Sequence, residues 1–328
     1  MTLSDLKSYS VEIREPVNIT YNGYRLYSTG VPSGGAVALS ILKIMEGYSS
    51  NDKNLSIHRL DEAMRYSYAA RSKLGDPAFF KHMSTFEASM ISPPTASKIR
   101  SLILDDRTRN VSEYAQLQNK ELFAMPENHG TSHIVASDSS GLSISLTSTV
   151  NLLFGSLLVV PETGIVLNNE MNDFSIPNVT NEFNLPPSPI NYIRPLKRPL
   201  SSITPIIVEH PNGTLYLTIG AAGGSRIITA TAQCVWHVLE GNLTVPEALG
   251  KARLHDQLIP GRTTFEDSLG GKIEGFDEAV VRSMREKGHN VTWISLPEAA
   301  VQGIRVLGDG SFEAGSEPRQ KNSAGLSV

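Results

Sequence analysis

The stretch NHGTSHIVAS, residues 128–137, places a threonine directly after a glycine and at the start of a predicted strand. Residues alternate through TSHIVAS, pass a DSSG turn and alternate again in LSISLTSTV, which predicts a β-hairpin beginning at Thr131. A threonine hydroxyl is a weak nucleophile, but an N-terminal threonine carries its own base, an α-amino group with a pKa of roughly 7.7–8.0. Taken alone, a threonine that starts a strand is more often structural than catalytic. We nevertheless predict that the chain cuts itself between Gly130 and Thr131, and that Thr131 then becomes the nucleophile.

The composition describes an ordinary globular protein. The chain has 328 residues, 40% of them hydrophobic, and a formal net charge of −4. It lacks a basic block, so no nucleic-acid partner is expected. The longest apolar runs, GAVALSILKIM and LLFGSLLVV, are shorter than the roughly 20 residues of a membrane-spanning helix. The opening MTLSDLKSYS has neither a basic start nor an apolar core, so no signal peptide is predicted.

Asparagine sequons are frequent in the sequence and bear on the compartment of the protein. Seven N-x-[ST] acceptors favour passage through the secretory pathway: Asn18, Asn54, Asn110, Asn178, Asn212, Asn242 and Asn290. The single cysteine, Cys234, excludes an internal disulfide framework and does not indicate a compartment. Secretory sequons without a signal peptide lead us to expect that the front end of the protein is missing.

Periodicity and turn residues predict mixed helices and strands. We expect short strands within residues 9–28 around an Asn22-Gly23 turn, and a polar linker over 107–130. A further strand is expected over 214–220 and a closing hairpin over 299–315. Helices are expected over 33–48, 56–77, 95–106, 223–241, 245–257 and 275–288. This order indicates an α+β architecture rather than a doubly wound one.

Several familiar catalytic motifs are absent from the sequence. It contains no H-E-x-x-H, C-x-x-C, G-x-G-x-x-G, G-x-x-x-x-G-K-[ST] or G-x-S-x-G. His129 and His133 are four residues apart, but that spacing suits zinc only on a helix, and Gly130 with the following strand argues against one. No metal is therefore expected, and a hydroxyl nucleophile is the main candidate.

Four long motifs carry a family resemblance. HGTSHIVASDSSGLSISLTSTVNLLFGS, GIVLNNEMNDFS, PLSSITP and GAAGGSRI closely resemble the γ-glutamyltranspeptidases, or glutathione hydrolases, which are N-terminal-nucleophile (Ntn) hydrolases that cleave themselves into two subunits. The resemblance implies a four-layer αββα sandwich. It equates residues 1–130 with the C-terminal part of the large subunit and 131–328 with the whole small subunit. The two parts would form one domain and stay paired after cleavage, with the N-terminal part of the family fold missing.

The resemblance also assigns site residues. It implies that Thr131 is the nucleophile, supported by the hydroxyl of Thr149, and that Gly223 and Gly224 form the oxyanion hole. A strand, a glycine turn and a helix independently place bare N–H groups at a helix N-terminus, where developing negative charge is stabilised. The remaining residues would bind the α-ammonium and α-carboxylate groups of the substrate: Asn151, Glu170 and Asp173 for the former, Ser201 and Ser202 for the latter. Without the resemblance, these would be polar turn, loop and strand residues.

The implied activity is acyl transfer. Thr131 would attack the γ-glutamyl amide of glutathione or another γ-glutamyl compound, and water, an amino acid or a dipeptide would accept the acyl group, without any cofactor. The family's arginine for the substrate carboxylate lies ahead of Met1, and Arg14 does not stand in its motif. Two alternatives stay open: a catalytically inactive, truncated remnant of this family, or a sibling Ntn acylase such as a cephalosporin acylase. Family members of this sequon-rich kind would be extracellular, on the cell surface or vacuolar.

Overall fold

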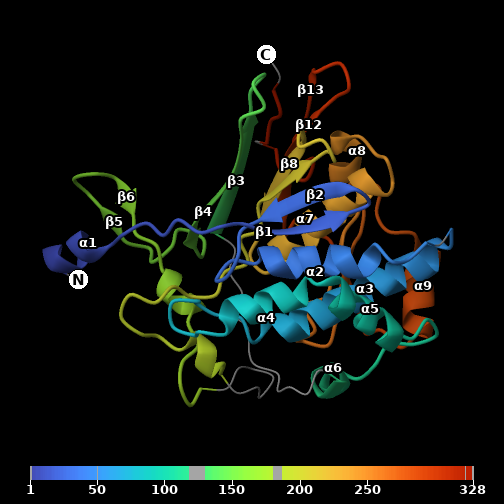
Figure 1. Ribbon diagram of the computed structural model, residues 1–328, viewed down its shortest axis with the longest axis horizontal. Coiled ribbons are helices and arrows are strands. Elements are labelled where there is room, and N and C mark those ends of the chain that lie inside the picture. The colour runs from blue at the N-terminus through green and yellow to red at the C-terminus, as the bar shows by residue number, and fades with distance from the viewer. Residues whose placement is uncertain (1, 50, 118–129, 180–186, 322, 327–328) are drawn as a thin grey trace.

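A six-stranded sheet forms the centre of the computed structural model, which describes residues 2–49, 51–117, 130–179, 187–321 and 323–326 (Figure 1). Neighbouring strands in this sheet are antiparallel throughout. In spatial order the strands are β1 (Val17–Tyr21), β2 (Tyr24–Ser28), β7 (Ile206–Glu209), β8 (Leu215–Ala222), β12 (Ala300–Val306) and β13 (Phe312–Gly315). The sheet therefore combines strands from both sides of the Gly130–Thr131 bond.

Smaller sheets accompany it. β3 (Gly130–Ser137) and β4 (Ser143–Asn151) form the predicted hairpin, in which Thr131 lies opposite Thr149. β9 (Leu254–His255), β10 (Thr263–Glu266) and β11 (Val291–Ile294) form a three-stranded sheet, and β5 (Val159–Val160) pairs with β6 (Ile165–Val166).

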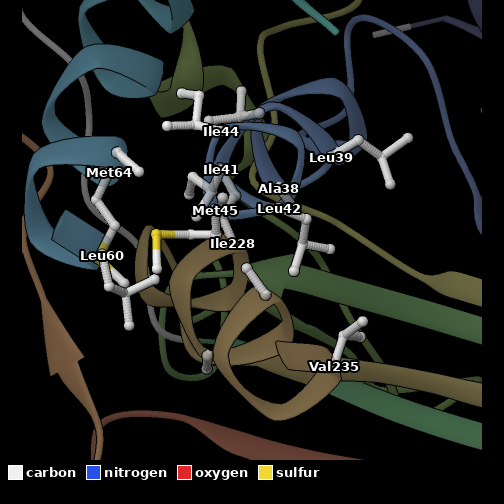
Figure 2. Packing of buried hydrophobic residues seen from close by; sticks show 14 of the residues in the cluster. Ala38, Leu39, Ile41, Leu42, Ile44, Met45, Leu60, Met64, Ile228 and Val235 are labelled. Atoms are coloured by element: carbon white, nitrogen blue, oxygen red, sulfur yellow. The ribbon is translucent and has the colours of Figure 1, made fainter. Parts of the chain in front are cut away.

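Helices pack on one face of the central sheet, apart from α1 (Leu3–Ser8), which has no buried residue. The helices are α1 (Leu3–Ser8), α2 (Gly35–Met45), α3 (Lys53–Arg71), α4 (Met83–Met90), α5 (Pro93–Leu102), α6 (Val111–Leu117), α7 (Arg226–Leu239), α8 (Val245–Gly250) and α9 (Glu278–Glu286), with 3-10 turns at Glu170–Asp173 and Pro189–Asn191. Figure 2 shows Leu42 of α2, Met64 of α3 and Ile228 of α7 within one cluster, and all three are fully buried. Burying each such side chain contributes about 1.5–3 kcal/mol to the stability of the fold. No described helix is both long and apolar enough to cross a membrane.

Strand β8 separates the helices from the hairpin. Its alternate residues Leu217 and Ile219 belong to the hydrophobic core, whereas Thr218 hydrogen-bonds Ser143 of the hairpin. Gly220 faces the ring of His133, and a Cβ atom there would lie 2.3 Å from that ring. Small residues thus let the hairpin pack closely on β8.

The outward face of the hairpin is apolar. Ile134, Ile144 and Leu146 are 62%, 55% and 52% exposed, because alternate residues of β3 and β4 point away from β8. Helices, central sheet and hairpin form three successive layers. The α+β class is confirmed.

The structure also corrects several expectations. The helix expected over 245–257 ends at Gly250, and Leu254–His255 form β9 instead, because Gln233 of α7 bonds both backbone groups of Leu254. The expected linker contains α6, capped by Glu113 at the Asn110 N–H; residues 118–129, including His129, lie outside the described part. The strands of the first 28 residues begin only at Val17. The division at residue 130 stays a prediction.

Candidate active site

A relay of hydroxyl groups surrounds the Gly130–Thr131 bond. Thr131 Oγ1 donates to Thr149 Oγ1 at 3.0 Å, and Thr149 Oγ1 donates to the carbonyl oxygen of Gly130 at 2.9 Å. The backbone N–H of Asn151 also donates to Thr149 Oγ1, at 2.8 Å. Since Thr149 accepts two hydrogen bonds, its own proton is directed at the Gly130 carbonyl, which it polarises.

Only glycine fits at position 130. A Cβ atom there would lie 2.1 Å from the carbonyl oxygen of Leu152 and 2.8 Å from that of Asn151. The register of the hairpin also shifts between Gly130 and Thr131. The backbone at the end of β4 and just after it therefore lies tightly against Gly130.

Asn151, Glu170 and Asp173 come together at the end of β4. Asn151 adopts a left-handed conformation (φ 75°), and its Nδ2 donates to Asp173 Oδ1 at 2.7 Å. That bond fixes the amide orientation and leaves Asn151 Oδ1 as an acceptor. Both Asn151 Oδ1 and Glu170 Oε2 are buried without a hydrogen-bond partner among the described residues. Burial, with the nearby charge of Asp173, raises the pKa of Glu170 to about 7.

Ser201 and Ser202 lie in a tightly bonded segment. The Ser201 N–H donates to the carbonyl of Pro32 at 2.8 Å, and Ser201 Oγ accepts from the Ile203 N–H at 3.2 Å. Ser202 is buried, and its Oγ accepts from Arg71 Nη2 at 2.9 Å. The segment therefore depends on residues that precede the Gly130–Thr131 bond.

Asn191 connects this serine segment to Asp173. Its Nδ2 donates to the Asp173 carbonyl at 2.6 Å, and its Oδ1 accepts from the Leu200 N–H at 3.1 Å. Contacts thus run without a break from Thr131 through Thr149, Asn151 and Asp173 to the serines.

Gly223 and Gly224 form the turn between β8 and α7. Both have positive φ, 130° and 59°, and a Cβ on Gly223 would lie 2.4 Å from the Glu298 carbonyl oxygen. Ala222, just before this turn, lines the same pocket of about 620 Å³ as Thr131. The turn thus lies at the helix N-terminus, directly after a residue that shares a pocket with the predicted nucleophile.

Among the described residues, neither His133 nor the histidine-containing cluster of the core presents an open metal site. His133 bonds Thr147 through Nδ1, and burial lowers its pKa to about 4. His58, Glu62 and His289 cluster in the core, but His58 Nδ1 and His289 Nε2 are 2.8 Å apart. Tetrahedral zinc with bonds of about 2.0–2.1 Å would need these nitrogens about 3.3 Å apart. A hydrogen bond accounts for the observed separation.

Sequence reasoning missed three residues of this site: Tyr68, Arg71 and Asn191. Tyr68 OH donates to the Ser225 carbonyl at 2.6 Å, directly after the glycine turn. Tyr68 and Arg71 lie in a predicted helix, and Asn191 follows prolines in a loop. For Tyr68 and Arg71, the one signal available in the sequence was the polar composition of their helix. The structure shows that residues 57–71 of this helix are almost all buried.

A threonine at the start of a strand, connected through Thr149 to its own preceding carbonyl and packed on an antiparallel sheet, has the arrangement expected of an Ntn hydrolase. The fold matches that of a cephalosporin acylase from Bacillus halodurans with a TM-score of 0.80, covering 100% of this chain and 55% of that chain at 23% identity. Residues 1–327 match the sequence model described as Gamma-glutamyltranspeptidase, and the chain belongs to this family.

Similar proteins agree with this assignment. The chain is 46% identical to "Glutathione hydrolase proenzyme" of Arthroderma benhamiae, over 100% of this chain and 55% of the relative. It is 39% identical to "Glutathione hydrolase" of Aspergillus flavus, over 99% of this chain and 54% of the relative. A γ-glutamyltranspeptidase structure from Pseudomonas nitroreducens, complexed with L-DON, aligns with a TM-score of 0.53 at 34% identity, covering 60% of this chain and 98% of that chain. The chain thus spans about half the length of these fungal relatives.

Proposed function

We propose that this chain carries the nucleophile and the amino-acid-binding groups of a γ-glutamyltransferase that hydrolyses glutathione. The observation that carries the proposal is the pair of buried acceptors, Asn151 Oδ1 and Glu170 Oε2, which find no hydrogen-bond partner in the described part of the chain. Leaving such acceptors unsatisfied costs about 1–3 kcal/mol each, and an α-ammonium group supplies the N–H donors they lack. Arg71 donates a hydrogen bond to Ser202, and this charged, buried pair suits an α-carboxylate.

The first reaction is self-cleavage. Thr131 Oγ1 adds to the Gly130 carbonyl carbon, while Thr149 Oγ1, 2.9 Å from the carbonyl oxygen, stabilises the oxyanion. The hydroxyl proton of Thr131 passes to the amide nitrogen as the C–N bond breaks, which leaves an ester. Water then hydrolyses the ester, giving a Gly130 carboxylate, a free Thr131 hydroxyl and a free Thr131 amine.

The second reaction uses the new N-terminus. The Thr131 amine accepts the proton of Oγ1 as this oxygen attacks the γ-carbonyl of the substrate. Gly223 and Gly224 hold the oxyanion, and the proton passes to the leaving amine, cysteinylglycine when the substrate is glutathione. Water releases glutamate from the acyl-threonine, or an amino acid or dipeptide takes the acyl group.

The acceptor cluster favours this substrate class over other acyl groups. An acylase for an uncharged acyl chain gains nothing from Asn151 Oδ1 and Glu170 Oε2, which would remain buried and unpaired. The α-ammonium group of an amino acid can donate hydrogen bonds to both oxygens. We therefore propose a γ-glutamyl substrate rather than the uncharged acyl group of a sibling acylase.

We further propose that the protein passes through the secretory pathway, to the cell surface, the exterior or the vacuole. Six of the seven sequon asparagines are exposed, and Asn54 is half-buried. An oligosaccharide could therefore be added at most of them.

Release of a chromogenic amine from γ-L-glutamyl-p-nitroanilide tests the function. The chain would be assayed alone and together with the upstream segment of the Arthroderma benhamiae relative, with Thr131→Ala as the inactive control. We expect release by the wild type, faster with glycylglycine as acceptor, and none by the variant. Absence of release from both preparations would contradict the proposal, and it would favour an inactive remnant.

A further inference from the structure

Arg71, the last residue of α3, lies between the groups assigned to the two charged ends of the substrate. We propose that Arg71 is a positioning residue: it aims the Ser202 hydroxyl at the substrate α-carboxylate and holds it in register with Asp173. The inference rests on the proposed function, which it deepens by assigning a residue ahead of the cleavage site to the carboxylate subsite.

The placement of Arg71 is fixed by burial. The residue is 3% exposed, and its Nη2 donates to Ser202 Oγ at 2.9 Å. Burial lowers the pKa of Arg71, but a guanidinium remains charged in proteins, and the nearby carboxylate of Asp173 favours that charge. A buried guanidinium without such partners would be costly, so its position is tied to both.

The hydrogen bond determines what Ser202 can do. A hydroxyl that accepts from a guanidinium keeps its own proton free to donate elsewhere. The charged donor also polarises the O–H bond, which makes Ser202 a stronger donor to an anion. The carbonyl of Ser202 accepts from Thr204 Oγ1 at 2.9 Å, so the backbone is held as well. Ser202 therefore offers one oriented proton.

Asp173 links the same guanidinium to the ammonium subsite. Its Oδ1 is bonded to Asn151 Nδ2, and Asn151 N is bonded to Thr149. Asn191 keeps the Asp173 backbone beside the serine segment. Arg71 thus adds an electrostatic connection between Asp173 and Ser202, whose backbone segments the hydrogen bonds of Asn191 already hold together.

The C-terminal end of α3, which carries Arg71, also contacts the glycine turn between β8 and α7. Tyr68 lies three residues before Arg71, on the same helix face, and its hydroxyl holds the Ser225 carbonyl at 2.6 Å. The guanidinium of Arg71 lies 5.9 Å from the Tyr68 ring. The last turn of α3, which precedes the cleavage site in the sequence, therefore contacts both Ser202 of the carboxylate subsite and the turn that holds Gly223 and Gly224.

A pair of substrates separates positioning from general stability. γ-L-Glutamyl-p-nitroanilide carries the α-carboxylate, whereas 4-aminobutyryl-p-nitroanilide keeps the ammonium group and lacks the carboxylate. Arg71→Met removes the donor and the charge at similar length, and Arg71→Lys keeps the charge. The matched control is Arg65→Met, on the same helix and equally buried, which loses an ion pair with Asp256 instead.

We expect Arg71→Met to raise KM for the γ-glutamyl anilide by about tenfold or more, since hydrogen bonds to charged groups are the strong ones. KM for the 4-aminobutyryl anilide, which lacks the carboxylate, should change by a much smaller factor. Arg71→Lys should recover part of the loss, and Arg65→Met should affect both substrates equally. Equal effects of Arg71→Met on both substrates, or no effect on either, would overturn the inference.

A wild type that turns over neither anilide would contradict the proposed function alone. The positioning role is then decided by thermal unfolding with saturating L-glutamate or 4-aminobutyrate. The inference requires that L-glutamate stabilise the wild type more than 4-aminobutyrate does, and that Arg71→Met abolish this difference. The same response in wild type and variant, including no response in either, would overturn it.

Discussion

Replacing Thr149 by valine removes one hydroxyl at nearly constant volume and tests the self-cleavage geometry. The variant loses the donor 2.9 Å from the Gly130 carbonyl oxygen and the acceptor for Thr131 Oγ1. Removing a single oxyanion donor typically costs about 2.7–4 kcal/mol in the transition state. Self-cleavage should therefore slow by roughly 100- to 1,000-fold.

The assay follows the fraction of intact chain with time by mass spectrometry after synthesis in a cell-free system. Thr149→Ser, which keeps a hydroxyl, should cleave much faster than Thr149→Val. Thr147→Val is the matched control, because Thr147 lies two residues earlier on the same strand face and bonds His133 at 2.8 Å. Cleavage of Thr149→Val at the wild-type rate would refute the role given to this hydroxyl.

Three further outcomes follow from the contacts. Gly130→Ala should lower the free energy of unfolding by about 1–3 kcal/mol in denaturant titrations, because its Cβ would meet the Leu152 carbonyl at 2.1 Å; an unchanged midpoint would contradict the tight fit. KM for γ-glutamyl substrates should rise about tenfold per pH unit below pH 7, as protonation of Glu170 removes the charge that binds ammonium, and Glu170→Gln should abolish this slope; a flat wild-type profile would count against it. Arg319→Met should cost about 3–5 kcal/mol of stability, since Glu266 loses its buried partner; a loss below 1 kcal/mol, measured by thermal unfolding, would show that the pair is dispensable.

Local patterns predicted the elements that surround the nucleophile. Alternation and the Asp138–Gly141 turn placed the hairpin, and the Asn22-Gly23 turn placed β1 and β2, because both turns need residues that tolerate positive φ, as Asn22, Gly23 and Gly141 do. Helices α2, α3 and α7 were predicted from periodicity and from the glycines near their ends. Such information lies within a few residues of each element.

Tertiary contacts decided what local patterns could not. The helix expected to continue past Gly250 stops there because Gln233, in α7, takes both backbone groups of Leu254 into a different pairing. The role inferred for Arg71 depends on Ser202, which is 131 residues away. The site residues Thr131, Thr149, Asn151 and Asp173 were reached through family motifs, and their assigned roles stay predictions that the observed geometry supports.

Intact-mass analysis and N-terminal sequencing of the purified chain, with Thr131→Ala alongside, test the central claim most directly. We predict two fragments from the wild type, residues 1–130 and 131–328, the second beginning Thr-Ser-His, and a single uncut chain from the variant. A wild-type chain that remains intact, or one that is cut at another bond, would contradict the claim that Thr131 becomes an N-terminal nucleophile.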